Sequence, residues 1–327
     1  MTYSLTFNLV PDIDAVASSL ILGGLRPSTR RTYASAQRFY MHFCIQHHLQ
    51  PLPTSEDTIL RYMAYCYSRK LSAATIQVYI SAVAYLQAIN GLPAPDVATY
   101  RIKLAIRAIK DLGPAPTKCA PVTFQLLQYI VGNVVQGDNG KLFAAMLSLG
   151  FFGALRGAEY AAVHIQNGVL LAPRLQDIQF VVYDGVYGLL YTIHKSKTVS
   201  VPITIAIGCS GHVICAVCMM TEYLQSKPAS LLHPQSYLFT FKDGRPVTKA
   251  HLNSVIKQQI QSLNLDCSNY STHSLRAGAA MTANQLGFNE DDIKQLGHWK
   301  SLAYQSYIRQ SYGHRLQFSK RLVQQPL

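Results

Sequence analysis

The sequence has few charged side chains, and acidic ones are scarce among them. Of its 327 residues 14% are charged, and 16 Asp and Glu stand against 29 Lys and Arg, which leaves a formal net charge of +13. Because 49% of the residues are hydrophobic, the chain can bury a core, which excludes a disordered basic tail. The excess of cations favours a polyanionic partner, either nucleic acid or an anionic membrane surface.

Long apolar segments are also absent. The stretch Leu142–Leu155 is free of charge but has 14 residues, whereas a membrane-spanning helix needs about 20. The uncharged stretch Thr198–Thr221 is broken by Pro202 and Gly208 and begins with the alternation of a strand. No basic segment precedes the apolar Ala15–Leu25, so no secretory signal is predicted. We expect an intracellular protein without a membrane partner, nuclear if its host is eukaryotic.

The seven cysteines are an odd number for a disulfide framework, and the lack of a secretory signal favours reduced thiols. Cys209, His212, Cys215 and Cys218 recur every three residues, a spacing that resembles half of a zinc site. Structural zinc sites usually add a second Cys or His pair, and the sequence has none at a matching distance. We therefore expect buried reduced cysteines at the start of a helix, with no metal and no other cofactor.

A proline-rich break divides the chain. Three prolines and one glycine fall between Leu112 and Pro121, which forbids continued helix and is typical of an interdomain linker. The length also favours about two domains. We predict an N-terminal domain over residues 1–113, a linker over 114–121 and a second domain over 122–327.

The first domain has a helical pattern throughout. Candidate caps and apolar spacing predict four helices. The first is capped at Ser28 or Thr29, the second at Thr54–Asp57 and the third at Ser72, and the fourth runs from about Val97 to Lys110.

The fourth predicted helix carries Lys103, Arg107 and Lys110 on one face, opposite Leu104, Ala105 and Ile109. Such a stripe is more often a solvated face than a binding site. Here it joins further cations in a domain with 11 basic and 6 acidic residues, and we predict that the set contacts DNA phosphates. The other members of this set are Arg26, Arg30, Arg31 and Arg38.

The second domain begins with helices over 124–135 and 141–155, and a small sheet follows. Asp184-Gly185 is a strong hairpin signal between strands at 180–183 and 186–193. A third strand alternates from Val199 to Ile207, which puts Lys195 and Lys197 in the second turn. Helix returns from Ala216 onward.

Four short motifs in this domain could carry chemistry. Arg156 has Glu159 three residues on, able to orient it. His273 and Arg276 stand one turn apart at a predicted helix start. The others are the lysine turn and Gly297-His298, with Tyr307 nine residues after His298. Each alone has an ordinary explanation, as an ion pair, a solvated lysine, a capping histidine or one of 20 tyrosines.

In this order and at these spacings the motifs resemble the tyrosine recombinase (phage integrase) family over nearly the whole chain. Ser196-Lys197-Thr198 is similar to the hairpin of phage integrases and favours Lys197 over Lys195. The segment 273–280, His-Ser-Leu-Arg-Ala-Gly-Ala-Ala, is most similar to the Crypton and DIRS-type recombinases of eukaryotic mobile elements. The resemblance implies a mainly α protein, with an N-terminal four-helix core-binding (SAM-like) domain. It also implies an α+β catalytic domain with a small three-stranded antiparallel sheet.

The resemblance assigns roles to these residues. Tyr307 is the expected nucleophile that forms a 3′-phosphotyrosine, and Lys197 protonates the departing 5′-oxygen. Two guanidiniums, Arg156 and Arg276, suit the non-bridging oxygens of a phosphate, since their forked donors match its geometry. The histidines, His273 and His298, add donors or move the phenol proton.

The expected function is site-specific DNA recombination, for integration or excision of a mobile element. Double-stranded DNA is the expected partner, with a dimer on each site and a tetramer in synapsis. Two alternatives stay open: a type IB topoisomerase-like enzyme, and a DNA-binding protein derived from a recombinase that no longer cleaves. The complete catalytic set and the compact two-domain layout favour the recombinase.

Overall fold

The computed structural model describes residues 12–93, 95–113, 119–164, 170–194, 201–299 and 301–308 of the chain. The chain divides after Pro116 into two compact units, each with its own buried hydrophobic cluster. The predicted linker spans this division, and its residues 114–118 lie outside the described part. None of the described helices is both long enough and apolar enough to cross a membrane.

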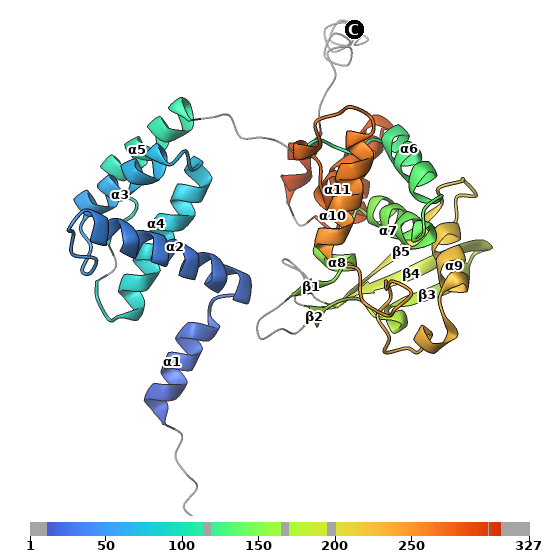
Figure 1. Cartoon of the computed structure of the whole chain (residues 1–327), viewed down its shortest axis with the longest axis horizontal. Coiled ribbons are helices and arrows are strands. Elements are labelled where there is room, and N and C mark those ends of the chain that lie inside the picture. The colour runs from blue at the N-terminus through green and yellow to red at the C-terminus, as the bar shows by residue number, and fades with distance from the viewer. Residues whose placement is uncertain are drawn as a thin grey trace, which may run out of the picture. The chain divides into compact units, whose positions relative to one another are not determined.

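Four helices enclose the core of the first unit: α2 (Pro27–Gln46), α3 (Glu56–Ser68), α4 (Ala73–Ile89) and α5 (Tyr100–Leu112) (Figure 1). Their buried faces meet around aromatic side chains such as Tyr40 and Tyr62, whose rings lie 5.0 Å apart. The predicted caps of α3 and α4 are confirmed, since Ser55 and Ser72 accept hydrogen bonds from helix amides.

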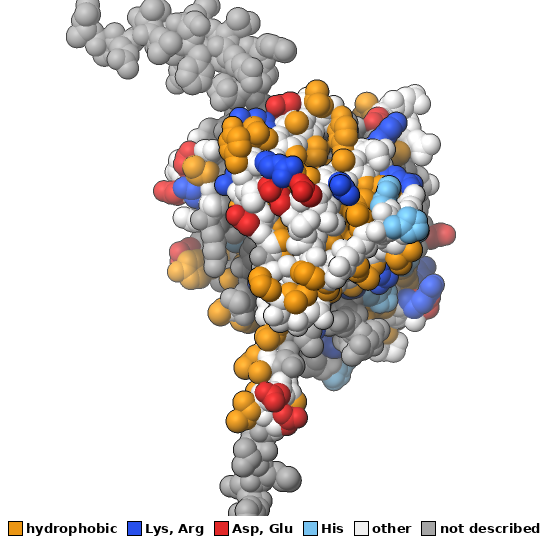
Figure 2. Space-filling view, turned by 90° about the vertical axis from the view of Figure 1, so that its left-hand side faces the viewer, with side chains coloured by type: hydrophobic (Ala, Val, Ile, Leu, Met, Phe, Trp, Pro, Cys, Tyr) orange, Lys and Arg blue, Asp and Glu red, His pale blue; other side chains and the backbone are white. Residues whose placement is uncertain are grey.

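Two details of this unit differ from the predictions. The helix α2 begins at Pro27 after Arg26, ahead of the predicted caps, because the fixed φ of proline suits a first helical position. A further helix, α1 (Ile13–Gly23), precedes it and was not predicted as a helix. It projects from the unit (Figure 1) and exposes apolar side chains such as Ile13 and Leu20. Figure 2 shows apolar side chains on the stalk at its lower end.

In the second unit, α7 (Gly140–Phe152) is buried along almost its whole length, and α6 (Phe124–Val134), α9 (Ala216–Ser226) and α11 (Thr272–Gln285) pack against it. Two further helices, α10 (Lys249–Gln261) and α12 (Glu290–Leu296), pack against α11. Because α7 is apolar on all sides, it suits a central position in the core. Figure 1 shows the sheet beside these helices.

The sheet has the antiparallel order β3 (Ile178–Tyr183), β4 (Val186–Ile193), β5 (Ile203–Gly208). The predicted hairpin is confirmed: Tyr183 pairs with Val186, and the turn residues Asp184 and Gly185 have φ of 48° and 76°. Positive φ at both positions is what a two-residue hairpin turn requires. The third strand starts later than predicted, at Ile203, and residues 195–200 lie outside the described chain.

Two further corrections concern the segment after α7. This helix ends at Phe152, so Arg156 does not close it and instead caps a separate short helix, α8 (Gly157–Tyr160). A two-stranded hairpin, β1 (Val163–His164) with β2 (Leu170–Leu171), follows and was not predicted. Strands of two residues carry too little alternation to be recognised in a sequence.

The close approach of α11 to the segment before α6 generates a stability prediction. A Cβ added to Gly278 would lie 1.7 Å from the carbonyl oxygen of Val122, a backbone atom that cannot rotate away. We expect Gly278→Ala to destabilise the fold by about 1–3 kcal/mol, as overpacking does. The matched control is Gly132→Ala on α6, where a Cβ meets nothing, and this change should leave stability equal or higher. Thermal unfolding of both variants measures the effect, and equal melting temperatures would contradict this contact.

Candidate active site

Arg156 and Glu159 form a closed pair at the start of α8. Glu159 accepts one hydrogen bond from the backbone amide of Arg156 at 2.7 Å and another from its Nη1 at 2.8 Å. The carboxylate is fully buried, whereas 24% of the arginine side chain is exposed. The pair therefore fixes the guanidinium while leaving part of it open to a ligand.

Gly157 brings this pair up to the start of α11. A Cβ at Gly157 would lie 2.3 Å from the hydroxyl oxygen of Thr272, so a larger residue would push the two segments apart. Thr272 is directly followed by His273, which places Arg156 beside the second motif of the sequence.

Arg276 is the most unusual charge in the unit, because it is 1% exposed and makes no salt bridge among the described residues. Its Nη1 donates to the carbonyl of Ala154, and its Nη2 donates to the carbonyl of Gly297 at 2.6 Å. The guanidinium lies 4.1 Å from the ring centre of Trp299, a cation–π contact. Burial, and then repulsion by Arg156, lowers the pKa of Arg276 to about 10, which leaves it charged.

His273 and Tyr307 face each other. Their ring centres lie 5.1 Å apart in an edge-on arrangement, and Trp299 lies 6.1 Å from the tyrosine ring. Burial lowers the pKa of His273, and the cations Arg276, Lys249 and Arg156 lower it further. The imidazole is therefore neutral near pH 7 and able to accept a proton.

His298 lies in the loop after α12 and belongs to the same cluster of side chains as Arg156 and Glu159. Its Nε2 lies 3.9 Å from Glu159 and has no hydrogen-bond partner in the described structure, although it is buried. Burial alone would raise the pKa of Glu159, but His298 and Arg156 together lower it to about 2. Since buried polar atoms are normally paired, the free Nε2 is suited to a ligand.

The structure thus brings together the predicted residues Arg156, Glu159, His273, Arg276, His298 and Tyr307. Lys197 lies outside the described residues. Tyr304 is 1% exposed and packs on Trp299, whereas Tyr307 is partly exposed on the 3-10 helix η5 (Leu302–Tyr307). The geometry therefore favours Tyr307 over Tyr304 as a reactive phenol.

Sequence reasoning missed two side chains that shape this site. Trp299 holds Arg276, and its signal was available, since it is the single tryptophan and adjoins His298. Lys249, at the start of α10, acts on the pKa of His273. Nothing in its local sequence marks it, because its position depends on how α10 packs.

The basic residues of the first unit lie on two helices. Lys103, Arg107 and Lys110 are exposed on α5 and line a groove of ≈ 520 Å³. The buried face of α5 is Ile102, Ile106 and Ile109, so the prediction that Leu104 belongs to it is wrong, with 42% of Leu104 exposed.

The remaining predicted cations lie on α2 or directly before it. Arg26 precedes the helix, Arg31 and Arg38 are exposed on it, and Arg30 is partly buried. Figure 2 shows cationic, acidic and apolar side chains interspersed on one face of this unit.

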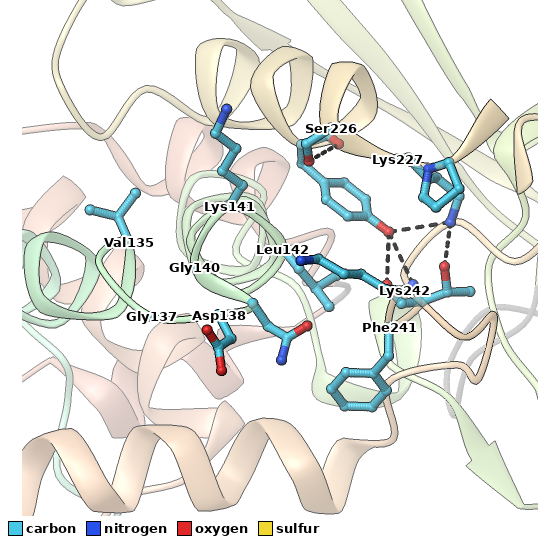
Figure 3. Close-up of a pocket in the computed structure, with 14 residues that line it drawn as sticks. Val135, Gly137, Asp138, Gly140, Lys141, Leu142, Ser226, Lys227, Phe241 and Lys242 are labelled. Atoms are coloured by element: carbon cyan, nitrogen blue, oxygen red, sulfur yellow. Dashed lines mark hydrogen bonds between the residues drawn. The ribbon is translucent and has the colours of Figure 1, made fainter.

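A separate cavity of ≈ 280 Å³ lies beside the start of α7 and the end of α9 (Figure 3). Its buried Lys227 has a pKa lowered to about 8 by burial. The ammonium lies within hydrogen-bond distance of the Tyr223 hydroxyl, the carbonyls of Tyr237 and Leu238, and the Thr240 hydroxyl. Because a lysine has three donors, none is left for a ligand, and Lys227 is a structural group.

Comparison with solved structures identifies the fold. The Tn1549 transposon integrase in complex with circular intermediate DNA matches with a TM-score of 0.59 and 11% identity, over 89% of this chain and 98% of that one. A lambda integrase dimer bound to a core site matches at 0.57 and 14%, over 91% and 94%. The XerH recombinase bound to its difH substrate in a post-cleavage complex matches at 0.59 and 15%, over 83% and 71%.

The chain is therefore mainly helical with a small three-stranded antiparallel sheet, the fold of tyrosine recombinases, and the predicted fold class is confirmed. In sequence, no protein-family model and no curated protein matches it.

The pair Arg156–Glu159 generates a pH prediction. Because the pKa of Glu159 is lowered from 4.5 to about 2, its ionisation stabilises the fold fully above pH 4.5 and loses that contribution as the pH falls towards 2. We expect Glu159→Gln to cost about 3 kcal/mol of unfolding free energy at neutral pH. The difference from wild type should shrink below pH 4.5.

Urea unfolding of both proteins, from neutral pH down to about pH 3, measures this difference. The control is Asp243→Asn, which removes a carboxylate paired with Arg245 in an exposed position and should change stability little. A Glu159→Gln deficit that stays constant with pH would show that Glu159 acts through packing rather than charge.

Proposed function

We propose that the protein is a site-specific DNA recombinase, which cleaves and rejoins strands through a covalent 3′-phosphotyrosine at Tyr307. The observation that carries this proposal is the buried Arg276. It is held by two carbonyls and a ring, without a carboxylate among the described residues, beside a second arginine and a partly exposed phenol. Such an excess of fixed positive charge suits an anion with two or more oxygens, as a phosphodiester has.

The proposed mechanism assigns one task to each side chain. The phenol oxygen of Tyr307 attacks phosphorus, its proton passes to the neutral His273, and the bond to the 5′-oxygen breaks. Guanidinium donors of Arg156 and Arg276 meet the charge that develops on the non-bridging oxygens, and Nε2 of His298 adds another donor.

Lys197 is proposed to protonate the departing 5′-oxygen, although it lies outside the described residues. Reversal of the same steps by a second 5′-hydroxyl rejoins the strand and frees the tyrosine. The phosphodiester bond is exchanged twice without net hydrolysis, so the scheme needs no high-energy cofactor.

We further propose that the first unit is a core-binding domain and the second the catalytic domain. Cations on α5 and α2 would then contact phosphates of the duplex. Recombination between two sites implies a dimer on each and a tetramer in synapsis. The resemblance of residues 273–280 to Crypton and DIRS-type recombinases favours a role in a mobile element.

The first prediction for this function uses a nicked duplex that traps the covalent product. The wild-type protein should form an adduct that survives denaturation, and Tyr307→Phe should reduce it by more than roughly 1,000-fold, because the nucleophile is removed. Tyr304→Phe is the matched control, since this neighbour on η5 is buried and should be dispensable.

The same experiment separates the alternatives. Joined products from two duplexes exclude a topoisomerase-like enzyme, and a wild-type protein that binds the duplex without any adduct would establish the silent DNA-binding alternative. An adduct retained in Tyr307→Phe would refute Tyr307 as the nucleophile.

The second prediction concerns the surface of α5. Replacing Lys103, Arg107 and Lys110 together by Gln should lower the slope of log affinity against log salt by about 3, since each phosphate contact contributes about 0.9. The control is Arg101→Gln on the same helix, because Arg101 is already paired with Glu56 and Asp57 at 3.3 and 2.9 Å. Affinity for duplex DNA, measured by fluorescence anisotropy at several salt concentrations, tests this. An unchanged slope in the triple variant would show that these three cations face solvent and do not contact phosphates.

A further inference from the structure

The connection from β5 to α9 gathers three thiols. Cys209 directly follows β5, Cys215 caps α9, and Cys218 lies one turn into that helix. The Cys209 sulfur lies 3.6 Å from that of Cys218 and 3.7 Å from that of Cys215. All three sulfurs fall within 4.8 Å of one another.

These separations are those of metal ligands. With zinc–sulfur bonds of about 2.3 Å, two corners of a tetrahedron lie about 3.8 Å apart. A disulfide would require about 2.05 Å between two sulfurs and would leave the third unpaired. Two of the three sulfur–sulfur distances thus match the edge of such a tetrahedron, and the third is below 4.8 Å.

The loop around the cysteines is shaped to hold them. The amide of Cys209 donates to the carbonyl of Tyr187 on β4 at 2.7 Å, which ties the first thiol to the sheet. Gly211 adopts φ of +66°, a left-handed turn that folds the loop back. The amide of Ser210 then donates to the Cys215 sulfur at 3.3 Å, a hydrogen bond that favours the thiolate form needed for metal binding.

His212, the fourth member of the sequence pattern, serves elsewhere. Its Nδ1 accepts a hydrogen bond from the amide of Ile214 at 3.3 Å, and its ring packs on Phe124 at 5.4 Å. Cys209 and Cys218 are partly exposed, so water can reach a fourth position. Zinc sites with three protein ligands and one open position are well known.

From this geometry we propose that Cys209, Cys215 and Cys218 bind one zinc ion through three thiolates, with water in the fourth position. The expectation of no metal rested on the missing second pair, whereas the proposed site needs only three of the four residues in the sequence cluster. The ion would join β5 to α9, and α9 packs against α7, the helix that precedes Arg156. This cross-link would form whether or not the protein recombines DNA.

The test is cobalt binding to the reduced full-length protein. About one Co²⁺ per chain should bind with a sulfur-to-cobalt charge-transfer band and the visible bands of tetrahedral cobalt, and Zn²⁺ should displace it. Cys218→Ser should weaken binding by more than the roughly 10- to 100-fold that changes outside the ligand set cost. Removing the metal from wild type should lower its melting temperature.

Cys267→Ser is the matched control, because Cys267 belongs to the same unit but not to the cluster, and it should keep the full signal. Circular dichroism shows which variants fold, and Cys209→Ser replaces Cys218→Ser if the latter does not. Two results would overturn the proposal. One is the absence of a charge-transfer band in wild-type protein whose thiols all react with a thiol reagent, and the other is a band in both the Cys218→Ser and Cys209→Ser proteins equal to that of wild type. A Cys209–Cys218 disulfide in protein purified without reductant would instead mark the cluster as a redox pair and also contradict the zinc site.

Discussion

The buried guanidinium of Arg276 is the constraint on which the rest of the second unit depends. Taking a charge out of water costs several kcal/mol unless fixed dipoles replace the solvent. Here the dipoles come from two distant segments, the carbonyl of Ala154 after α7 and that of Gly297 after α12, with the Trp299 ring completing the shell. One side chain on α11 therefore holds together the loops that carry Arg156 and His298.

The charge balance of the site follows from that arrangement. Glu159 is the carboxylate that pairs with Arg156, and its hydrogen bonds go to that arginine rather than to Arg276. The positive charge gathered around His273 is thus only partly neutralised in the described residues, and it adds to the effect of burial in lowering the pKa of the imidazole. The repulsion between these cations opposes folding, and a bound phosphate would relieve it, so ligand binding and stability are coupled here.

Features set by local chemistry could be predicted from the sequence. The Asp184-Gly185 turn, the Ser55 and Ser72 caps and the pair Arg156–Glu159 each depend on residues within four positions of one another. Their side chains and backbone therefore determine the outcome with little help from the rest of the chain. Alternation and helical spacing predicted the order helices, small sheet, helices, and the resemblance to tyrosine recombinases implied the fold class.

Features set by packing could not be predicted. The partners of Arg276 lie 122 and 21 residues away, and Lys249 reaches His273 only through the position of α10. The thiol cluster was predicted in part: the spacing grouped Cys209, Cys215 and Cys218, but only the position of the end of β5 beside α9 brings the sulfurs of Cys209 and Cys218 to 3.6 Å. Spacing along the chain suggested His212 as their companion, and the fold turns that ring towards Phe124 instead.

The placement of Tyr307 has a consequence for how the molecule could be switched. The two guanidiniums belong to α11 and to the N-cap of α8, whereas the phenol belongs to the short η5, anchored by the buried Tyr304. A 3-10 helix has weaker hydrogen bonds than an α-helix, so it rearranges at lower cost. The proposed anion pocket would remain assembled if η5 moved away from it. Binding of the phosphate and attack by the phenol could therefore be regulated separately.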